Sequence, residues 1–322
     1  NMGLLNIARV ITNADNYVGT NELVTRALST ADFPNLMANV LNKKLRREYE
    51  YIPRTYEPIT FKTEVADFKP VSRVQMGDVS PLVEKPEHGG YREGKFADAA
   101  ETYAIKEYGR KIIITRKMLI NDDLNSTFRL PTMIARRAAE LESDLAWYCL
   151  LQNNLMGDKI PLFDQKHKNY ATKGGLISIQ TVGEAFRAMR SQVGISEGSD
   201  KPMKLNIRAV YLVVPAALET QALQFLHQTS PTKDQDTNPY KSLKLIVEPR
   251  LDDISQTAWY IASDLGQIDL LEMAYLQGQS GVFMESKIDF DTDGIALKCR
   301  LDVGAKAIDY RGFYKNDGAS AQ

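Results

Sequence analysis

The side chains in this sequence that could do acid–base or metal chemistry are few and far apart. The three histidines are His88, His167 and His227, and no two have the H-x-x-x-H spacing that places two metal ligands on one helix face. His167 follows Asp164 in PLFDQKHKNY, so a hydrolase with an Asp–His acid–base pair is one interpretation. No Ser or Cys nearby completes a nucleophilic set. We favour a loop that docks by hydrogen bonds.

The other polar motifs have simpler interpretations. His88, in KPEHGG, could contact a partner or respond to pH, but a solvated turn at a hairpin tip is favoured. His227 is expected near a helix end, where a cation offsets the helix dipole. The stretch DFDTDG resembles part of a calcium loop, but Arg300 stands where the bidentate Glu is needed, which favours an Asp-Gly hairpin turn. No phosphate-binding loop or nucleophile elbow occurs, and no metal or cofactor is expected.

A basic cluster lies in the helix-like stretch DFPNLMANVLNKKLRRE, and its members are Lys43, Lys44, Arg46 and Arg47. Such a cluster could face the phosphates of DNA. It could equally be a solvated helix face that pairs with Glu48 and Glu50. The formal net charge of -1, from 40 basic and 41 acidic side chains, argues against a dedicated nucleic-acid-binding protein. The solvated face is therefore favoured.

The bulk composition is that of an ordinary globular protein. The 322 residues are 43% hydrophobic and 25% charged, enough for one elaborated domain or two. Cys149 and Cys299 form no CxxC pair and are interpreted as buried free thiols of a reducing compartment. No apolar run has membrane-spanning length, and no signal peptide is recognised. Asn1 before Met2 fits either a tag scar or a cut from a longer precursor.

Hydrophobic periodicity predicts an α+β protein. A long helix is predicted over 128–152 and a shorter one over 182–193, the latter with Thr181 and Glu184 as a capping box. The stripe of the long helix is Ile134, Ala138, Leu141, Leu145 and Tyr148. Two alternating runs between residues 56 and 118 flank a Gly- and Pro-rich segment and predict a very long hairpin. From residue 208 onward, short apolar runs predict strands and one further helix.

The stretch DGIALKCRLDVGAKAIDYRGFYKN alternates like two strands but carries no catalytic group. Ile308 and Tyr310 share one face of such a strand, and we expect them to pack on the long helix. Asp309 and Arg311 would then lie on the other face, with Arg311 toward a neighbouring subunit. Extensions that cannot bury themselves indicate a partner, most simply a second copy of the chain.

Several segments together resemble the major capsid proteins of tailed phages and prophages. These are STADFPNLMANVLNKKL, ITRKMLINDDL, PLFDQKHKNY, LNIRAVYLVVPAALE, IVEPRLDD with AWYIASD, AYLQGQSGVF and the closing DGIALKCRLDVGAKAIDYRGFYKN. The chain is most similar to the group often fused to a Clp-like prohead protease and related to Mu-like major head subunits. The resemblance runs from about residue 25 to residue 318 in the family's order. The protease part is missing from this chain, so no peptidase activity is transferred, and under the family precedent Asn1 would be a proteolytic end.

This resemblance implies the Hong Kong 97-type capsid fold. An N-terminal arm would cover 1–57, an extended E-loop hairpin 58–108, a peripheral domain 109–204 and 281–322, and an axial domain 205–280. The function implied is a structural shell of pentamers and hexamers around double-stranded DNA, in the virion, with assembly in the host cytoplasm. A cellular nanocompartment shell with the same fold is the alternative.

The resemblance also implies partners and assembly residues. The partners would be further copies of the chain, a portal, a prohead protease or scaffolding protein, and DNA bound without sequence specificity, with no membrane. The expected assembly residues are Lys85, His88, Gly89, Gly90 and Tyr91 in the hairpin and Ile308, Tyr310, Arg311 and Phe313 near the end.

Overall fold

The architecture is taken from a computed structural model of the chain. It describes residues 9, 12–13, 17–19, 22–23, 26, 32–75, 99–115, 117, 124–194, 203–227, 238–289 and 294–318. The helices are α3 (Asp32–Tyr51), α5 (Leu124–Leu151), α6 (Ile179–Arg190) and α7 (Glu219–Leu226). Short 3-10 turns are formed by Glu57–Ile59, Ala216–Leu218, Pro249–Asp253 and Tyr310–Gly312.

The strands form three sheets. The first half of the chain supplies β1 (Thr60–Val65), β2 (Val71–Gln75), β3 (Ala99–Tyr103) and β4 (Lys106–Thr115). The second half supplies β5 (Ala209–Val214), β6 (Lys244–Val247), β7 (Trp259–Ser263), β8 (Leu271–Leu276), β9 (Phe283–Asp289), β10 (Gly294–Ala307) and β11 (Phe313–Asn316). The fold is therefore α+β, as the periodicity predicts.

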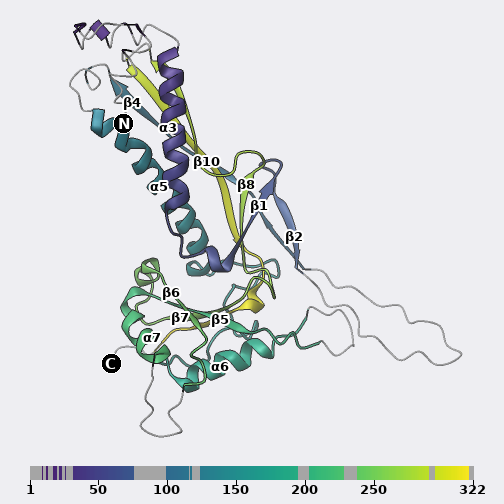
Figure 1. The fold of residues 1–322 in the computed structure, drawn as a ribbon. Helices are drawn as coiled ribbons and strands as arrows, with labels where there is room; N and C mark the ends of the chain where they lie inside the picture. The colour runs from purple at the N-terminus through teal and green to yellow at the C-terminus, as the bar shows by residue number, and fades with distance from the viewer. Residues whose placement is uncertain are drawn as a thin grey trace, which may run out of the picture.

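The largest sheet is organised around the long strand β10. Its order is β1-β8-β10-β4. Strand β9 pairs with the same edge of β10 as β8, but β9 pairs with the first half of β10 and β8 with its last residues. Helices α3 and α5 lie next to each other against this sheet (Figure 1). They do so because Leu41 and Leu45 of α3 and Ala135, Ala146 and Trp147 of α5 are fully buried apolar side chains.

The second sheet has the order β11-β7-β5-β6. Its inner strand β5 reads AVYLVV and is buried along most of its length, which is the pattern of a strand covered on both faces. Helices α6 and α7 belong to this half of the molecule (Figure 1). One apolar core nevertheless reaches both sheets, since Tyr260 of β7 and Met273 of β8 belong to the same cluster of buried side chains.

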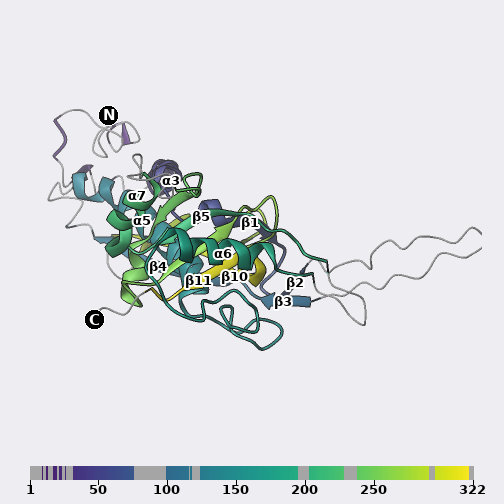
Figure 2. The ribbon, with the colours of Figure 1, turned by 90° about the horizontal axis from the view of Figure 1, so that it is seen from below.

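The strands β2 and β3 form a two-stranded antiparallel sheet of their own, which we call the ribbon. Seen from below, the ribbon projects from the side of the body (Figure 2). The predicted continuous strand through Ile114 is broken at Ala104 and Ile105, because β3 pairs with β2 whereas β4 pairs with β10. The hairpin tip lies outside the described residues, and so do residues 290–293 of the DFDTDG turn.

Three local predictions from the sequence need correction. Helix α6 begins earlier than predicted: its N-cap is Ser178, and the capping box is formed by Ser178 and Thr181. Tyr148 of α5 is 44% exposed, so the apolar stripe ends before it. Cys149 is buried as expected, whereas Cys299 is only half-buried, and both are free thiols.

The domain boundaries expected from the resemblance remain predictions. The observed strand pairing does not follow two of these boundaries. Strand β8 falls within the range expected for the axial domain but pairs with β1 and β10. Strand β11 falls within the range expected for the peripheral domain but pairs with β7. The segment 308–312 is therefore one of the covalent links between the two large sheets, and we call it the link.

Candidate functional site

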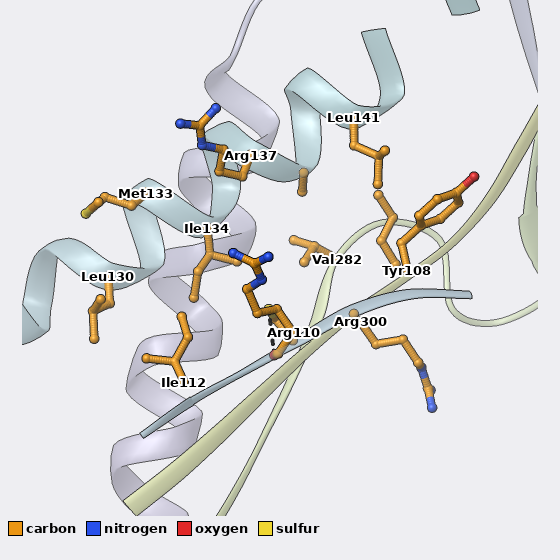
Figure 3. A pocket seen from close by; sticks show the side chains of 14 residues that line it. Tyr108, Arg110, Ile112, Leu130, Met133, Ile134, Arg137, Leu141, Val282 and Arg300 are labelled. Atoms are coloured by element: carbon orange, nitrogen blue, oxygen red, sulfur yellow. Dashed lines mark hydrogen bonds between the residues drawn. The ribbon is translucent and has the colours of Figure 1, made fainter. Parts of the chain in front are cut away.

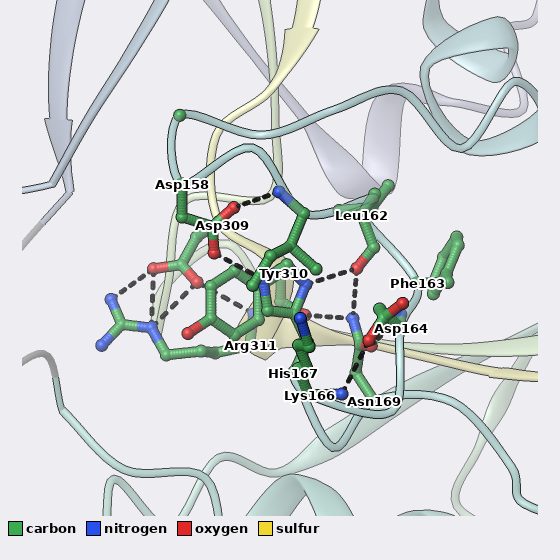
Figure 4. Close-up of polar contacts among 12 residues, drawn as sticks. Asp158, Leu162, Phe163, Asp164, Lys166, His167, Asn169, Asp309, Tyr310 and Arg311 are labelled. Atoms are coloured by element: carbon green, nitrogen blue, oxygen red, sulfur yellow. Dashed lines mark hydrogen bonds and ion pairs between the residues drawn. The ribbon is translucent and has the colours of Figure 1, made fainter.

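The loop that contains His167 packs against the link between the sheets (Figure 4). His167 is 4% exposed; its Nε2 lies 2.7 Å from Oδ2 of Asp158 and its Nδ1 lies 3.1 Å from the carbonyl oxygen of Leu162. Its ring stacks on Tyr310, with centroids 3.7 Å apart and planes 6° from parallel. Asp164 instead accepts a hydrogen bond from the backbone N–H of Lys166. The proposed Asp164–His167 pair is therefore wrong, and the docked loop is confirmed.

Asn169 fastens the same loop to the link. Its amide nitrogen donates to the carbonyl oxygens of Leu162 at 2.7 Å and of Tyr310 at 3.2 Å, and its oxygen accepts from the backbone N–H of Asp164. Asn169 has no exposed surface. All of its polar atoms thus serve the internal structure.

The expected faces of residues 308–311 are wrong. Strand β10 ends at Ala307, and Tyr310–Gly312 form a 3-10 turn, so residues two apart no longer share a strand face. Arg311 is 2% exposed and forms a two-point ion pair with the buried Asp309, with Nε 2.9 Å from Oδ1. Ile308 and Phe313 are buried, as expected for Ile308, whereas Tyr310 is half-buried on His167. In this subunit, Arg311 therefore does not point to a neighbour.

A second polar cluster joins α3, α5 and β8. Glu142 of α5 has no exposed surface and accepts hydrogen bonds from Tyr49, Arg54, Tyr56 and Tyr275. The Nε of Arg54 lies 3.0 Å from Oε2, and the hydroxyl of Tyr275 lies 2.8 Å from Oε1. Burial, and then the Glu142 carboxylate, raise the pKa of all three tyrosines above its ordinary value. The phenols therefore remain donors to Glu142.

An apolar cavity of about 460 Å³ opens between α5 and the paired strands β4 and β10 (Figure 3). Ile112, Ile134 and Leu141 are among the side chains that line it, and Met133 at its edge is 61% exposed. Arg110 and Arg137 also line it. An apolar surface next to cationic side chains is a common feature of protein contact sites.

The basic cluster lies on the solvent side of α3. Lys43, Arg46 and Arg47 are exposed, Lys44 is half-buried, and the guanidinium of Arg47 lies 5.8 Å from the ring centroid of Tyr51. The expected hairpin residues Lys85, His88, Gly89, Gly90 and Tyr91 lie outside the described residues. His227 caps the C-terminal end of α7, where it was expected.

The positions of the two buried acids Glu142 and Glu272 are marked by the apolar residues around them in the sequence. Glu142 stands on the same helix face as Ala135, Ala139 and Ala146, and Glu272 stands inside the apolar run LLEMAYL. An acidic residue on an apolar face is buried only when it is paired. This pattern predicts that each buried acid has cationic or hydroxyl partners. It does not predict that Arg54 is one of them.

The described residues offer neither a metal cluster nor a membrane-spanning helix. Within the described ranges, no group of three or more His, Cys, Asp or Glu side chains could hold a metal ion. None of the helices that the structure describes is both long and apolar enough to cross a bilayer. The polar clusters consist of side chains that satisfy one another inside the subunit, and the fold combines two packed sheets with a projecting ribbon.

A family model described as phage capsid protein matches residues 99–316, and the chain belongs to this family. It is therefore a shell-forming capsid protein. No curated protein sequence matches the chain.

Solved structures share the fold at low sequence identity. A phage-related protein from Bordetella bronchiseptica RB50 is 12% identical with a TM-score of 0.55, covering 88% of this chain and 97% of that one. A chain of Mycobacterium phage Patience is 11% identical with a TM-score of 0.54, covering 91% of both chains. The procapsid of bacteriophage JBD30 is 11% identical with a TM-score of 0.51, covering 91% of this chain and 77% of that one.

Proposed function

We propose that this chain is the major head subunit of a tailed phage or prophage. It assembles into pentamers and hexamers of an icosahedral shell that encloses double-stranded DNA. The observation that carries this proposal, beyond the family, is the ribbon. It is fixed to the body at its base, yet it forms no ladder with either large sheet among the described strands. Its outer face carries Val74, which is 57% exposed, and a two-stranded ribbon gains stability when such a face packs on another surface.

The Hong Kong 97-type subdivision is part of the proposal. The arm (1–57), the E-loop (58–108), the peripheral domain (109–204 and 281–322) and the axial domain (205–280) keep the boundaries given above. Residues 76–98, which include Lys85, His88, Gly89, Gly90 and Tyr91, would contact the neighbouring subunit. The apolar cavity beside α5 is a second surface suited to such a contact. A portal and a prohead protease or scaffolding protein would act with the shell in the host cytoplasm.

Packaged DNA would meet the shell without sequence specificity. The exposed Lys43, Arg46 and Arg47 are the side chains suited to its phosphates, because each phosphate contact releases counterions. Replacing all three by Gln should leave empty shells intact and weaken the retention of DNA fragments, with a shallower salt dependence. Parental DNA retention across a salt series would instead assign these residues to a solvated helix face.

The decisive experiment is electron microscopy of the purified chain together with one hairpin variant. In the variant, residues 76–98 are replaced by Asn-Gly, which suits a two-residue hairpin because Gln75 and Ala99 are directly paired. The parent should form rings or closed shells. The variant should keep the melting temperature of the parental subunit but remain unassembled. A parent that stays monomeric by light scattering at high concentration, or a variant that forms normal shells, would contradict the proposal.

A further inference from the structure

One face of the ribbon lies against the body, and it is polar except at its start, where the paired Val71 and Tyr103 pack on a small apolar cluster. Arg73 on β2 is directly opposite Glu101 on β3, and Gln75 lies two residues farther along the same face. Glu101 is 2% exposed and Gln75 is 4% exposed. On the other face, Val74 is 57% exposed. The ribbon is therefore attached by polar side chains together with the apolar contacts of Val71 and Tyr103, whereas Val74 on its other face is exposed.

The body presents a matching pair of charges. Glu272 on β8 is directly opposite Lys306 on β10. Glu272 has no exposed surface, and the side chain of Lys306 is 20% exposed. Each pair of strands thus contributes one cation and one anion in register. We call Arg73, Glu101, Glu272 and Lys306 the charge quartet.

The two pairs dock crosswise. Two nitrogens of Arg73 contact the carboxylate of Glu272: Nε lies 2.7 Å from Oε1 and 3.0 Å from Oε2, and Nη2 lies 2.6 Å from Oε1, so this contact is a two-point ion pair. The Nζ of Lys306 lies 3.3 Å from Oε2 of Glu101. The cation of the ribbon thus lies against the anion of the sheet, and the anion of the ribbon lies against the cation of the sheet.

This alternation allows one docking direction. If the ribbon were reversed in its plane, Arg73 would meet Lys306 and Glu101 would meet Glu272. Like charges brought together at a desolvated contact are strongly disfavoured. A slip of β2 by one residue against β3 would place Arg73 and Glu101 on opposite faces of the ribbon. An apolar face of the same size would not discriminate between these positions as sharply.

Three further hydrogen bonds hold the same docking position. The guanidinium of Arg73 also donates to Oγ1 of Thr63 on β1 at 3.1 Å. The side-chain amide of Gln75 donates to the carbonyl oxygen of Ile308, at the link between the large sheets. The backbone N–H of Gly157 donates to Glu101. The ribbon base is therefore attached to three separate parts of the body.

We propose that the charge quartet is a positioning device that fixes the direction in which the hairpin leaves the subunit, and thereby the angle between neighbouring subunits in the shell. The second half of this statement rests on the proposed function. Twenty-three residues separate Gln75 from Ala99. A small rotation at the base displaces the outer part of a projecting hairpin in proportion to its length. Shell curvature is then sensitive to the quartet.

Two double variants remove the ion pairs without leaving a buried charge. They are R73M/E272Q and E101Q/K306M. The matched control is E57Q/K62M, which removes an ion pair of 2.8 Å between side chains that are 47% and 48% exposed next to β1. The apolar core is unchanged in all three variants, so each subunit should retain its far-ultraviolet circular dichroism spectrum.

Hydrogen exchange tests the attachment itself in unassembled subunits. Amides of β2 and β3 should exchange roughly tenfold faster in both quartet variants, while amides of β5 keep parental rates. The control should match the parent throughout. Unchanged exchange at the ribbon would overturn the positioning role, whether or not the parent forms shells.

Particle size tests the consequence. Electron microscopy should show uniform particles for the parent and the control, and a broad range of diameters, open sheets or tubes for the quartet variants. Uniform parental diameters from both quartet variants would refute the link to curvature. A parent that forms no shells would instead refute the proposed function, and the exchange experiment would still decide the attachment.

Discussion

Replacing Glu142 by Gln tests whether a buried carboxylate holds helix α3 to the rest of the subunit. Glu142 lies at the meeting point of α3, α5 and β8 and accepts from four donors. Gln keeps the shape but supplies one acceptor oxygen and one NH₂ group, which would face two donors. The side chain of Arg54 is 6% exposed and would lose its carboxylate.

The expected loss follows from the burial of both partners. Removing one member of a buried ion pair typically costs about 3–5 kcal/mol, because the remaining charge is left uncompensated in a poorly hydrated site. A domain has only about 5–15 kcal/mol of stability in total. Glu142→Gln should therefore lower the free energy of unfolding by about 3–5 kcal/mol, a large part of the total.

Urea denaturation of unassembled subunits, followed by circular dichroism, measures this loss as a lower midpoint with an unchanged slope. The control is Glu140→Gln on the same helix, which removes an exposed ion pair with Arg137 and should cost less than about 1 kcal/mol. If the two variants unfold within about 1 kcal/mol of each other, the carboxylate does not hold α3 as argued, and the apolar contacts of Leu41 and Leu45 suffice.

Three further predictions concern the thiols, a close approach and the link between the sheets. Burial raises the pKa of the Cys149 thiol to about 12. At pH 8 a disulfide reagent should therefore modify the half-buried Cys299 first and Cys149 only on unfolding. Rapid modification of both thiols in the folded subunit would contradict this. Gly312→Ala would place Cβ 2.2 Å from Cδ2 of Leu270 and should lower the melting temperature. The control Gly266→Ala should not, because the nearest atom to its Cβ is 3.6 Å away. Equal melting temperatures for the two variants would refute the close approach. Arg311→Met leaves the buried Asp309 uncompensated and should destabilise the subunit by about 3–5 kcal/mol in urea denaturation; a parental midpoint would show that the pair is dispensable.

The elements predicted best from the sequence were those with strong periodicity or an unbroken apolar run. The long helix, the strand AVYLVV and the alternating β10 were found because their side chains repeat with the period of the structure that buries them. Boundaries were less accurate. The start of α6 was missed because Ser178 and Thr181 cap each other through their own hydroxyls, which the T-x-x-E pattern does not describe.

The link between the sheets could not be predicted from alternation. Residues 308–311 alternate apolar and polar as a strand would, but the chain turns there because it passes from one sheet to the other. Asp309 and Arg311 then meet as a buried ion pair inside the subunit, where alternation had placed both on an outward face. The charge quartet was missed for a related reason: its members are adjacent only through the registers of two separate ladders, which local sequence does not encode.

The position of β11 affects the order in which the chain can complete its fold during synthesis. Strand β7 pairs with β5 on one side and with β11 on the other, yet β11 begins at Phe313, fifty residues after β7 ends at Ser263. At about 5–20 residues per second, the ribosome needs roughly 3–10 seconds to supply it. During this interval the newly made β7 has an unpaired edge, the kind of surface on which nascent chains associate wrongly. Slower translation through residues 264–312 would therefore lengthen the time for which this edge is unpaired.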